Sequence, residues 1–554
     1  MAHNSSRRWF GLAVLAFGVS VIIVDATIVN VIVPSIIGDL GLEIADAEWV
    51  VTIYSVLFAA LLLPLGRVGD LLGRRRMFRI GLIGFGAASI LAAAAPSGAA
   101  LIGARVLQGL AAAMILPSTL ASVNALFRGK ERAIAFGVWG SVVGGMAALG
   151  PLLGGWLTTT FDWRWAFWIN VPIVLVVLVG SVLVDETIDR THAPGWDVGG
   201  IATSAVGLGG IVFGLIEGNR YGWWTPIREF RVGSWTWPST VLSPVPVAIA
   251  VGAMALVGFV TIERRRGAEG RTVLLDLGLL RLRSFRNGNL TSAVLGLGEF
   301  GVIFVLPLFL QAVLGFTAFR VGLVLSSLAL GAFIGGPFAA GLAHRYGPRR
   351  VVSAGMAIEA VAVFAIAWVL DPAMSVTALV PLLFVYGIGV GLATAQLTNV
   401  ILVEVPATES GMASGARTGF RQIGSALGIA IIGTVLATSL GAHTADNLSR
   451  IPGLPPAVAD TVTEIIKTTG GQALPEIAAR PDSGPVVTAI EEAFGSAATT
   501  AGLTAAAFIV FGFLLSLTLP DVAEAPERDD PADDRSTPNE LPGAETPLHH
   551  VGDA

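Results

Sequence analysis

The chain has 554 residues, of which 54% are hydrophobic and only 13% are charged. This composition excludes an ordinary soluble globular protein. The absence of cysteine excludes disulfides, thiolate metal sites and cysteine nucleophiles. The six histidines form no ligand cluster in the sequence, so we predict neither a metal site nor a cofactor.

Fourteen apolar segments are long enough to cross a bilayer, which takes about 20 residues per helix. The first follows Arg7 and Arg8 but is too long for a secretion signal, contains Asp25 and has no small-residue cleavage site, so it is a membrane helix. The predicted spans are 10–34, 48–65, 78–96, 99–123, 132–158, 165–184, 198–216, 246–263, 288–313, 319–343, 350–370, 377–398, 415–437 and 498–518.

The turns between these spans predict the orientation of the chain. An even number of spans places both termini on one side of the membrane. Clusters of basic residues mark the cytoplasmic side, so we predict that both termini are cytoplasmic. The basic clusters on that side lie at 74–76, 128–130, 264–266, 281–286 and 349–350.

A repeated turn indicates two related halves. Gly73 and the basic residues after it have a counterpart at Gly347, although His344 stands where the first turn has Asp70. We therefore predict an all-α integral membrane protein of two pseudo-symmetric six-helix bundles plus two linker helices. The predicted units are 1–190 (first bundle), 191–285 (two added helices and a cytoplasmic connector), 286–520 (second bundle, with an outer loop at 438–497 and a short amphipathic helix at 457–467) and 521–554 (a disordered cytoplasmic tail).

The turn after the second span carries the most informative motif: Gly66, Asp70, Gly73, Arg74 and Arg75. It resembles the loop signature between the second and third helices of the major facilitator superfamily. Asp70 can accept hydrogen bonds from a neighbouring helix N-terminus, or pair with a basic residue, when the cytoplasmic side closes. The alternative is a plain basic loop that obeys the charge rule.

Further stretches resemble the fourteen-helix drug/proton antiporter family within that superfamily. Two departures from the family pattern are Met146, where a glycine is usual, and His344. The matching stretches are 25–34, 105–109, 150–155, 163–172, 411–415 and 421–424.

Ionisable residues inside the bilayer are functional candidates because their burial is costly. Asp25 and Arg105 lie at similar depths in the first and fourth spans, and the resemblance implies that these spans are neighbours. Motion of Arg105 would then switch Asp25 between holding and releasing a proton. The alternative is a fixed buried ion pair that orders the bundle.

The second half offers weaker candidates. Glu299, in the counterpart of the first span, could bind a cationic substrate, carry a second proton or pack a helix. For Glu359 we favour an internal hydrogen bond over transport. Gln396 and Asn399 are expected to line the pathway. Arg417 and Arg421 are expected near the cytoplasmic interface.

The glycines of the fifth span favour close helix contact, and Pro151 is expected to bend that helix. The resemblance implies that Gly150, Pro151, Gly154 and Gly155 form a seam that seals against the other half and prevents leak. Ordinary small-residue packing is the alternative.

The chain has no phosphate-binding loop of the Gly-x-x-x-x-Gly-Lys-Ser/Thr type, so an ion gradient must supply the energy. We predict a monomeric, non-enzymatic, proton-coupled transporter of the bacterial inner membrane, with no nucleic-acid partner. It would export hydrophobic, cationic drugs by alternating access. The alternatives are an exporter of one endogenous metabolite or lipid and a non-transporting membrane scaffold or sensor.

Overall fold

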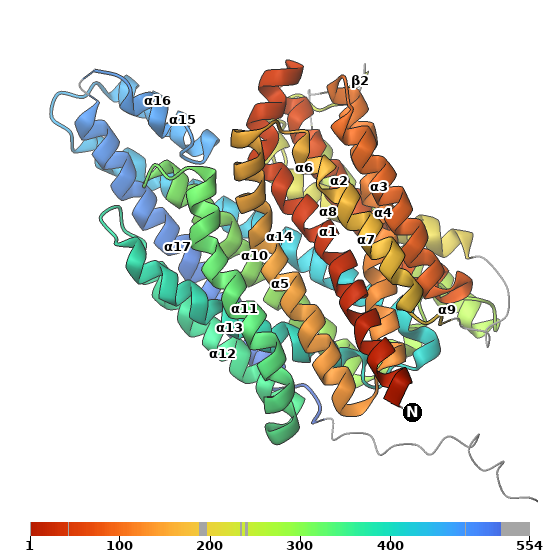
Figure 1. Ribbon diagram of the computed structural model, residues 1–554. Coiled ribbons are helices and arrows are strands. Elements are labelled where there is room, and N and C mark those ends of the chain that lie inside the picture. Colours follow the sequence, from red (N-terminus) through yellow and green to blue (C-terminus); the bar gives the residue numbers. More distant parts are fainter. Residues whose placement is uncertain are drawn as a thin grey trace, which may run out of the picture.

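The computed structural model describes residues 2–42, 44–187, 197–232, 235–238, 242–481 and 483–521. Long helices run side by side through the molecule, and the N-terminus and the last described residues lie at the same end (Figure 1). The predicted tail at 521–554 lies, except for its first residue, outside the described residues.

The first group of helices begins with five helices of 20 to 39 residues and ends with a broken helix. They are α1 (Ala2–Leu40), α2 (Ile44–Leu72), α3 (Arg74–Ala93), α4 (Gly98–Leu126), α5 (Gly129–Thr160), α6 (Trp165–Trp168), α7 (Asn170–Gly180) and the 3-10 helix η1 (Ser181–Leu183). We call this set the first helix group.

Two added helices and a short hairpin follow. They are α8 (Val198–Tyr221), β1 (Arg231–Val232), β2 (Trp235–Thr236), α9 (Pro244–Ala268) and η2 (Leu277–Arg281). The strands pair antiparallel, with Arg231 opposite Thr236 and Val232 opposite Trp235.

The remaining helices form the second helix group. They are α10 (Arg283–Ala312), α11 (Ala318–Tyr346), α12 (Pro348–Val369), α13 (Val376–Leu402), η3 (Ala407–Glu409), α14 (Ser410–Ser449), α15 (Pro456–Thr469), α16 (Leu474–Ala478) and α17 (Gly484–Ser516).

The fourteen-helix fold predicted from the hydropathy pattern is confirmed. Thirteen helices in the described part are long and apolar enough to cross a membrane. The remaining predicted span, 132–158, lies within α5, several of whose side chains fall outside the described residues.

Local sequence signals set the helix ends. The hydroxyl of Ser97 accepts a hydrogen bond from the Ala100 N–H at the start of α4, and Thr317 does the same for Arg320 at the start of α11. Gly73 and Gly347 separate α2 from α3 and α11 from α12 with φ values of 101° and 86°. Both ends of the predicted repeat therefore turn on a glycine in a conformation that other residues rarely adopt.

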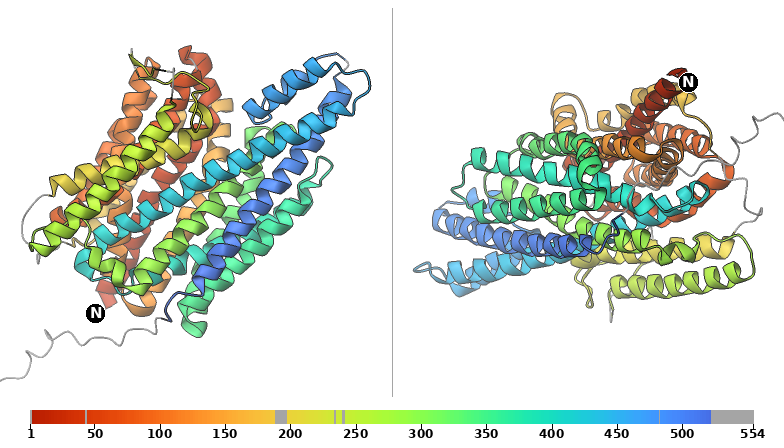
Figure 2. Two further views of the ribbon diagram at one scale, coloured as in Figure 1. Left: turned by 180° about the vertical axis from the view of Figure 1, so that it is seen from behind. Right: turned by 90° about the horizontal axis from the view of Figure 1, so that it is seen from below.

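Helix packing divides the molecule into neighbourhoods. In the first group α5 and α7 pack on α1, while α2 and α3 pack on α4. In the second group α10 packs on α14 and α17, and α13 packs on α11 and α12. The groups meet where α5 contacts α11 and where α2 contacts α14. The helices α8 and α9 lie side by side on one face, where α8 contacts α2 and α14 (Figure 2).

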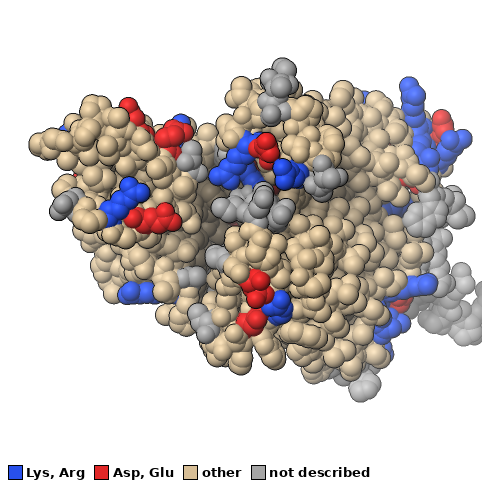
Figure 3. Space-filling model, turned by 90° about the horizontal axis from the view of Figure 1, so that it is seen from above, with Lys and Arg blue, Asp and Glu red and all other residues tan. Residues whose placement is uncertain are grey.

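The segment 438–497 differs from the predicted outer loop because most of it is helical. The helix α14 continues to Ser449, and α17 already begins at Gly484. Buried apolar residues such as Ile466 and Phe494 pack into the same core cluster as the second helix group, which stabilises the added helices. The amphipathic helix predicted at 457–467 is present as α15. Seen from the end that carries α15, α16 and the hairpin, the molecule shows few charged residues (Figure 3).

Candidate functional site

Asp25 of α1 and Arg105 of α4 form a buried ion pair. An Arg105 guanidinium nitrogen lies 2.5 Å from Asp25 Oδ2, and the two residues are 0% and 1% exposed. The other Asp25 oxygen accepts hydrogen bonds from Gln108 Nε2 at 3.1 Å and from Asn170 Nδ2 at 2.8 Å. The contact predicted from the similar depths of the two residues and from the family resemblance is therefore present, with two further donors around it.

Surrounding polar groups hold this pair in place. The Arg105 Nε–H donates to the carbonyl of Val50 at 3.0 Å, and its guanidinium lies 4.3 Å from the centre of the Tyr54 ring. Ser89 Oγ accepts hydrogen bonds from Gln108 and Asn170. Five helices, α1, α2, α3, α4 and α7, thus contribute to one buried polar cluster.

Sequence reasoning missed much of this cluster. Gln108 and Asn170 stand in matched motifs, but nothing in the sequence alone assigned them to Asp25. Tyr54 and Ser89 gave no signal at all, since single polar residues on helices are common. A carboxylate with three donors is well suited to carry a negative charge, and loss of Arg105 would leave a poorly compensated charge.

A second buried polar cluster lies in the second helix group. Arg421 of α14 reaches Glu299 in the middle of α10, with 2.7 Å between the guanidinium and Oε2. The expectation that Arg421 lies near the cytoplasmic interface is therefore wrong, because the ion pair draws this side chain into the bundle. Glu299 Oε1 has no hydrogen-bond partner among the described residues.

The surroundings of Glu359 in α12 also differ from our expectation. It is 0% exposed, and neither carboxyl oxygen makes a hydrogen bond within the described part of the chain, contrary to the internal bond that we favoured. It lies within electrostatic range of Glu299 and Arg421. Since an isolated buried carboxylate is very costly, we expect Glu359 to be uncharged in this state.

Gln396 and Asn399 lie on α13 where the two helix groups meet. Arg132 of α5 donates from Nε to Asn399 Oδ1 at 3.1 Å, and Asn399 Nδ2 donates to Gln396 Oε1 at 3.4 Å. On the neighbouring helix, Arg417 donates to the Thr398 hydroxyl at 2.5 Å. Of these contacts, the one between Arg132 and Asn399 joins the two helix groups.

The Asp70 loop docks onto the N-terminus of α14. Asp70 Oδ1 accepts from the Gly411 N–H at 3.0 Å and Oδ2 from the Met412 N–H at 2.9 Å, while Arg74 pairs with the same carboxylate at 2.6 Å. Both interactions that the sequence allows for Asp70 are present. A Cβ on Gly411 would lie only 2.4 Å from Asp70 Oδ1, so this approach requires glycine.

The other loop residues support this docking. A Cβ on Gly66 would lie 2.6 Å from the Gly411 carbonyl oxygen, so α2 and α14 are in backbone contact. The carboxylate of Glu186 accepts hydrogen bonds from the backbone N–H groups of Arg75 and Arg76, which caps the start of α3.

The glycines predicted to form the antiporter seam face two directions. Gly150 and Gly154 lie against Thr27 and Ile28 of α1, which belongs to the same helix group. A Cβ on Gly155 would instead lie 3.3 Å from the backbone of Phe319 of α11, in the other group. The side chain of Pro151 lies outside the described residues.

Within the described residues, no group of three or more His, Cys, Asp or Glu side chains could hold a metal ion.

Comparison with known proteins agrees with the fold. The family model for the Major Facilitator Superfamily matches residues 15–198 and 197–429. The chain is 34% identical to the puromycin resistance protein pur8 of Streptomyces alboniger over 80% of its own length and 84% of the relative's. It is 34% identical to a probable actinorhodin transporter of Streptomyces coelicolor, over 79% of this chain and 74% of that one.

A third relative is the multidrug efflux pump LfrA of Mycolicibacterium smegmatis, 32% identical over 88% of this chain and 94% of the relative. Among solved structures, the human organic anion transporter MFSD10 matches with a TM-score of 0.57 and 14% identity, over 92% of this chain and 99% of that one. At this identity the structural likeness shows the fold alone. With the family match, the two buried clusters and the docked loop, the chain belongs to the major facilitator superfamily, a superfamily of membrane transporters.

Proposed function

We propose that this protein is a proton-coupled secondary transporter that exports small hydrophobic, cationic drugs from a bacterial cell by alternating access. Relatives named for puromycin resistance and multidrug efflux support the drug export. The proton coupling rests on the chemistry of the Asp25 cluster. The protein acts as a monomer in the inner membrane, with both termini in the cytoplasm.

The observation that carries the proposal is the Asp25–Arg105 pair at 2.5 Å with 0% and 1% exposure. A charged pair at this depth needs the donors around it. When Arg105 moves away, the carboxylate loses its counter-ion and takes a proton instead. Return of Arg105 displaces the proton, so one side-chain movement couples proton transfer to the conformation of the bundle.

The contacts between the helix groups support a state that is closed at the cytoplasmic end. Asp70 holds the N-terminus of α14, Asn124 Nδ2 donates to the Ser410 hydroxyl at 2.7 Å, and Arg132 binds Asn399. In our proposal these contacts break when the two six-helix bundles, 1–190 and 286–520, rock apart to admit substrate from the cytoplasm. The pair α8 and α9 within 191–285 links the bundles.

A second candidate function is the export of one endogenous metabolite. The relative named as a probable actinorhodin transporter favours it, since that name describes a single compound. The same fold and the same buried clusters would serve both functions, and the acidic residues Asp25 and Glu299 favour a cation in either case.

Proton movement in inverted membrane vesicles tests the proposal. With an acidic lumen, lipophilic cations such as ethidium should raise the lumenal pH, because each drug molecule that enters exchanges for protons that leave. The Asp25→Asn variant should give no response. The matched control is Asp39→Asn, the same change on an exposed part of α1, which should behave like the wild type.

Each outcome separates the candidates. A response to several unrelated cations supports multidrug antiport, and a response to one compound alone supports a dedicated exporter. No response of the wild type to any cation would contradict cation antiport.

A further inference from the structure

Two buried carboxyl groups meet at one end of the added helices α8 and α9. Asp197 precedes α8 and its Oδ1 accepts a hydrogen bond from the Gly200 N–H at 2.8 Å. Glu263 lies near the end of α9, and its Oε2 accepts from the backbone N–H groups of Leu274 and Leu275 at 3.0 and 3.4 Å. The two residues are 4% and 2% exposed.

The second oxygen of each carboxyl group has no hydrogen-bond donor among the described residues. Asp197 Oδ2 and Glu263 Oε1 make no hydrogen bond to the rest of the described chain. They converge on one point, because a Cβ on Gly200 would lie 2.5 Å from the first and 2.4 Å from the second. Both oxygens therefore lie beside the same backbone position, and the charge of one carboxylate opposes ionisation of the other. Two acceptors in such a contact require one proton between them.

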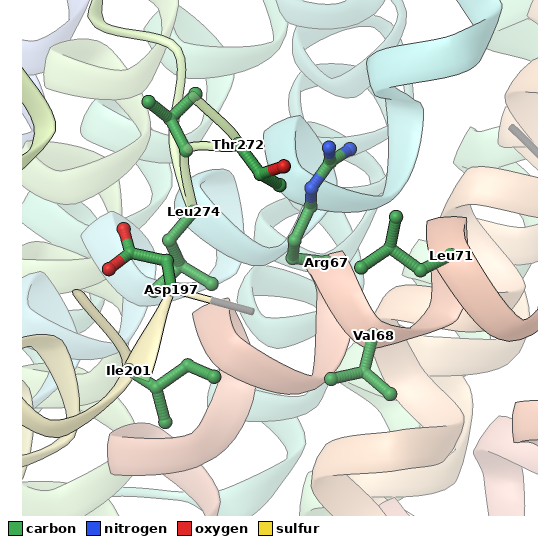
Figure 4. Close-up of a pocket in the computed structure, with 8 residues that line it drawn as sticks. Arg67, Val68, Leu71, Asp197, Ile201, Thr272 and Leu274 are labelled. Carbon is green, nitrogen blue, oxygen red and sulfur yellow. The ribbon is translucent and has the colours of Figure 1, made fainter. Parts of the chain in front are cut away.

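The nearby cations do not supply that hydrogen. Arg266 Nε lies 3.4 Å from Asp197 Oδ2, and the guanidinium balances the charge of that carboxylate. The one hydrogen on Nε, however, is donated to the Thr272 carbonyl at 3.0 Å. Arg67 of α2 borders a small cavity beside Asp197 that Thr272 and Leu274 also line (Figure 4), and its charge also acts on Asp70.

The connector itself carries three charged residues, of which Glu269 and Arg271 pair with each other at 3.1 Å and the third is Asp276. The Asp276 carboxylate accepts from the Gly278 N–H at 2.7 Å and so caps η2 instead of facing the pair.

The pair is mechanically joined to the docked loop. Glu263 fixes Leu274 and Leu275, and the next N–H, that of Asp276, donates to Met412 Sδ at 3.1 Å. The N–H of Met412 donates in turn to Asp70 at 2.9 Å. The connector at 269–276 therefore bridges the carboxyl pair and the N-terminus of α14.

We propose that Asp197 and Glu263 form a proton-binding site that holds one shared proton and keeps the connector seated on Met412. Loss of the proton at alkaline pH places two carboxylates against each other. Repulsion then moves Glu263 away and frees the N–H groups of Leu274 and Leu275. The site is separate from the Asp25 cluster and goes beyond the proposed function, since it controls how firmly the closed end is held.

Amide substitutions reproduce the protonated pair. In Glu263→Gln, the side-chain NH₂ donates to Asp197 Oδ2 while the amide oxygen still accepts from Leu274 and Leu275. In Asp197→Asn, the NH₂ donates to Glu263 Oε1 and the oxygen still accepts from Gly200. Both variants should therefore fold and remain in the seated form at every pH.

Hydrogen–deuterium exchange of the full-length protein in lipid nanodiscs tests the site without measuring transport. Peptides covering 272–276 and 410–414 are followed from about pH 6 to about pH 9, with intrinsic exchange rates corrected. In the wild type, protection of both peptides should fall by about tenfold as the pH rises. Glu263→Gln and Asp197→Asn should remain protected throughout.

The matched control is Glu269→Gln, which removes an exposed carboxylate from the same connector and should behave like the wild type. The proposal is overturned if the wild type shows no transition, or if the amide variants show the same one. The exchange result does not depend on whether Asp25→Asn loses transport. The two proposals can therefore be contradicted independently.

Discussion

The two helix groups hold their buried acids in opposite ways. In the first group Asp25 receives hydrogen bonds from Arg105, Gln108 and Asn170, and both of its oxygens are satisfied. In the second group Glu299 has one partner, Arg421, and Glu359 has no donor among the described residues. The comparison teaches that equal burial does not imply equal charge. The donors of the first site stabilise an anion, whereas the surroundings of Glu359 favour the uncharged carboxylic acid.

Removal of the arginine from the first site should have the largest effect. Arg105→Ala leaves the Asp25 carboxylate buried without its counter-ion and should lower the free energy of unfolding by about 3–5 kcal/mol. Thermal unfolding in detergent measures this loss. The Arg105→Ala/Asp25→Asn double variant should recover much of the stability, because the uncompensated charge is gone. A double variant no more stable than Arg105→Ala would contradict the anionic site.

The comparison extends to the two related turns. Asp70 docks on α14, whereas its counterpart His344 is exposed. Gly411→Ala would place a methyl group 2.4 Å from Asp70 Oδ1. The clash should lower the free energy of unfolding by about 1–3 kcal/mol and weaken the contact between the Asp70 loop and α14.

Maleimide labelling can report this opening, because the natural chain has no cysteine. A cysteine introduced at Ser414, which is 0% exposed, should react faster in the Gly411→Ala background. The control is Gly341→Ala, where a Cβ would meet nothing within 4 Å. Equal rates in both backgrounds would count against the docking role of Asp70.

Replacement of the neutral acid should have the smallest effect. Glu359→Gln keeps an uncharged side chain of nearly the same size, so the free energy of unfolding should change by less than about 1 kcal/mol. Thermal unfolding across neutral pH measures it. A loss as large as that of Arg105→Ala would show that Glu359 is ionised in the folded protein, and the contrast between the groups would fail.

The fold was readable from the sequence because hydropathy reports membrane spans directly. Each predicted span falls on a helix, and the aligned glycines Gly73 and Gly347 both adopt positive φ. The extensions of α14 and α17 were not readable. Their residues are amphipathic, so only packing against the second helix group decides between helix and loop.

The sites were only partly readable. The similar depths of Asp25 and Arg105 follow from counting along helices, and the family resemblance implies that their two spans are neighbours, so together they predict the contact. The pairing of Arg421 with Glu299 and the missing partners of Glu359 depend on rotation and tilt of the helices. Hydropathy does not encode those angles. The contact between Asp197 and Glu263 also joins the start of α8 to the end of α9, and neither residue stands in a matched motif.

Substrate-induced proton release from purified protein tests the central claim most directly. In weakly buffered detergent solution, a transported cation added to the wild type should release protons, because substrate favours the state in which Arg105 pairs with an ionised Asp25. Asp25→Asn should bind the same cation without releasing protons. Equal proton release by wild type and Asp25→Asn would contradict the account and place the coupling proton on another group.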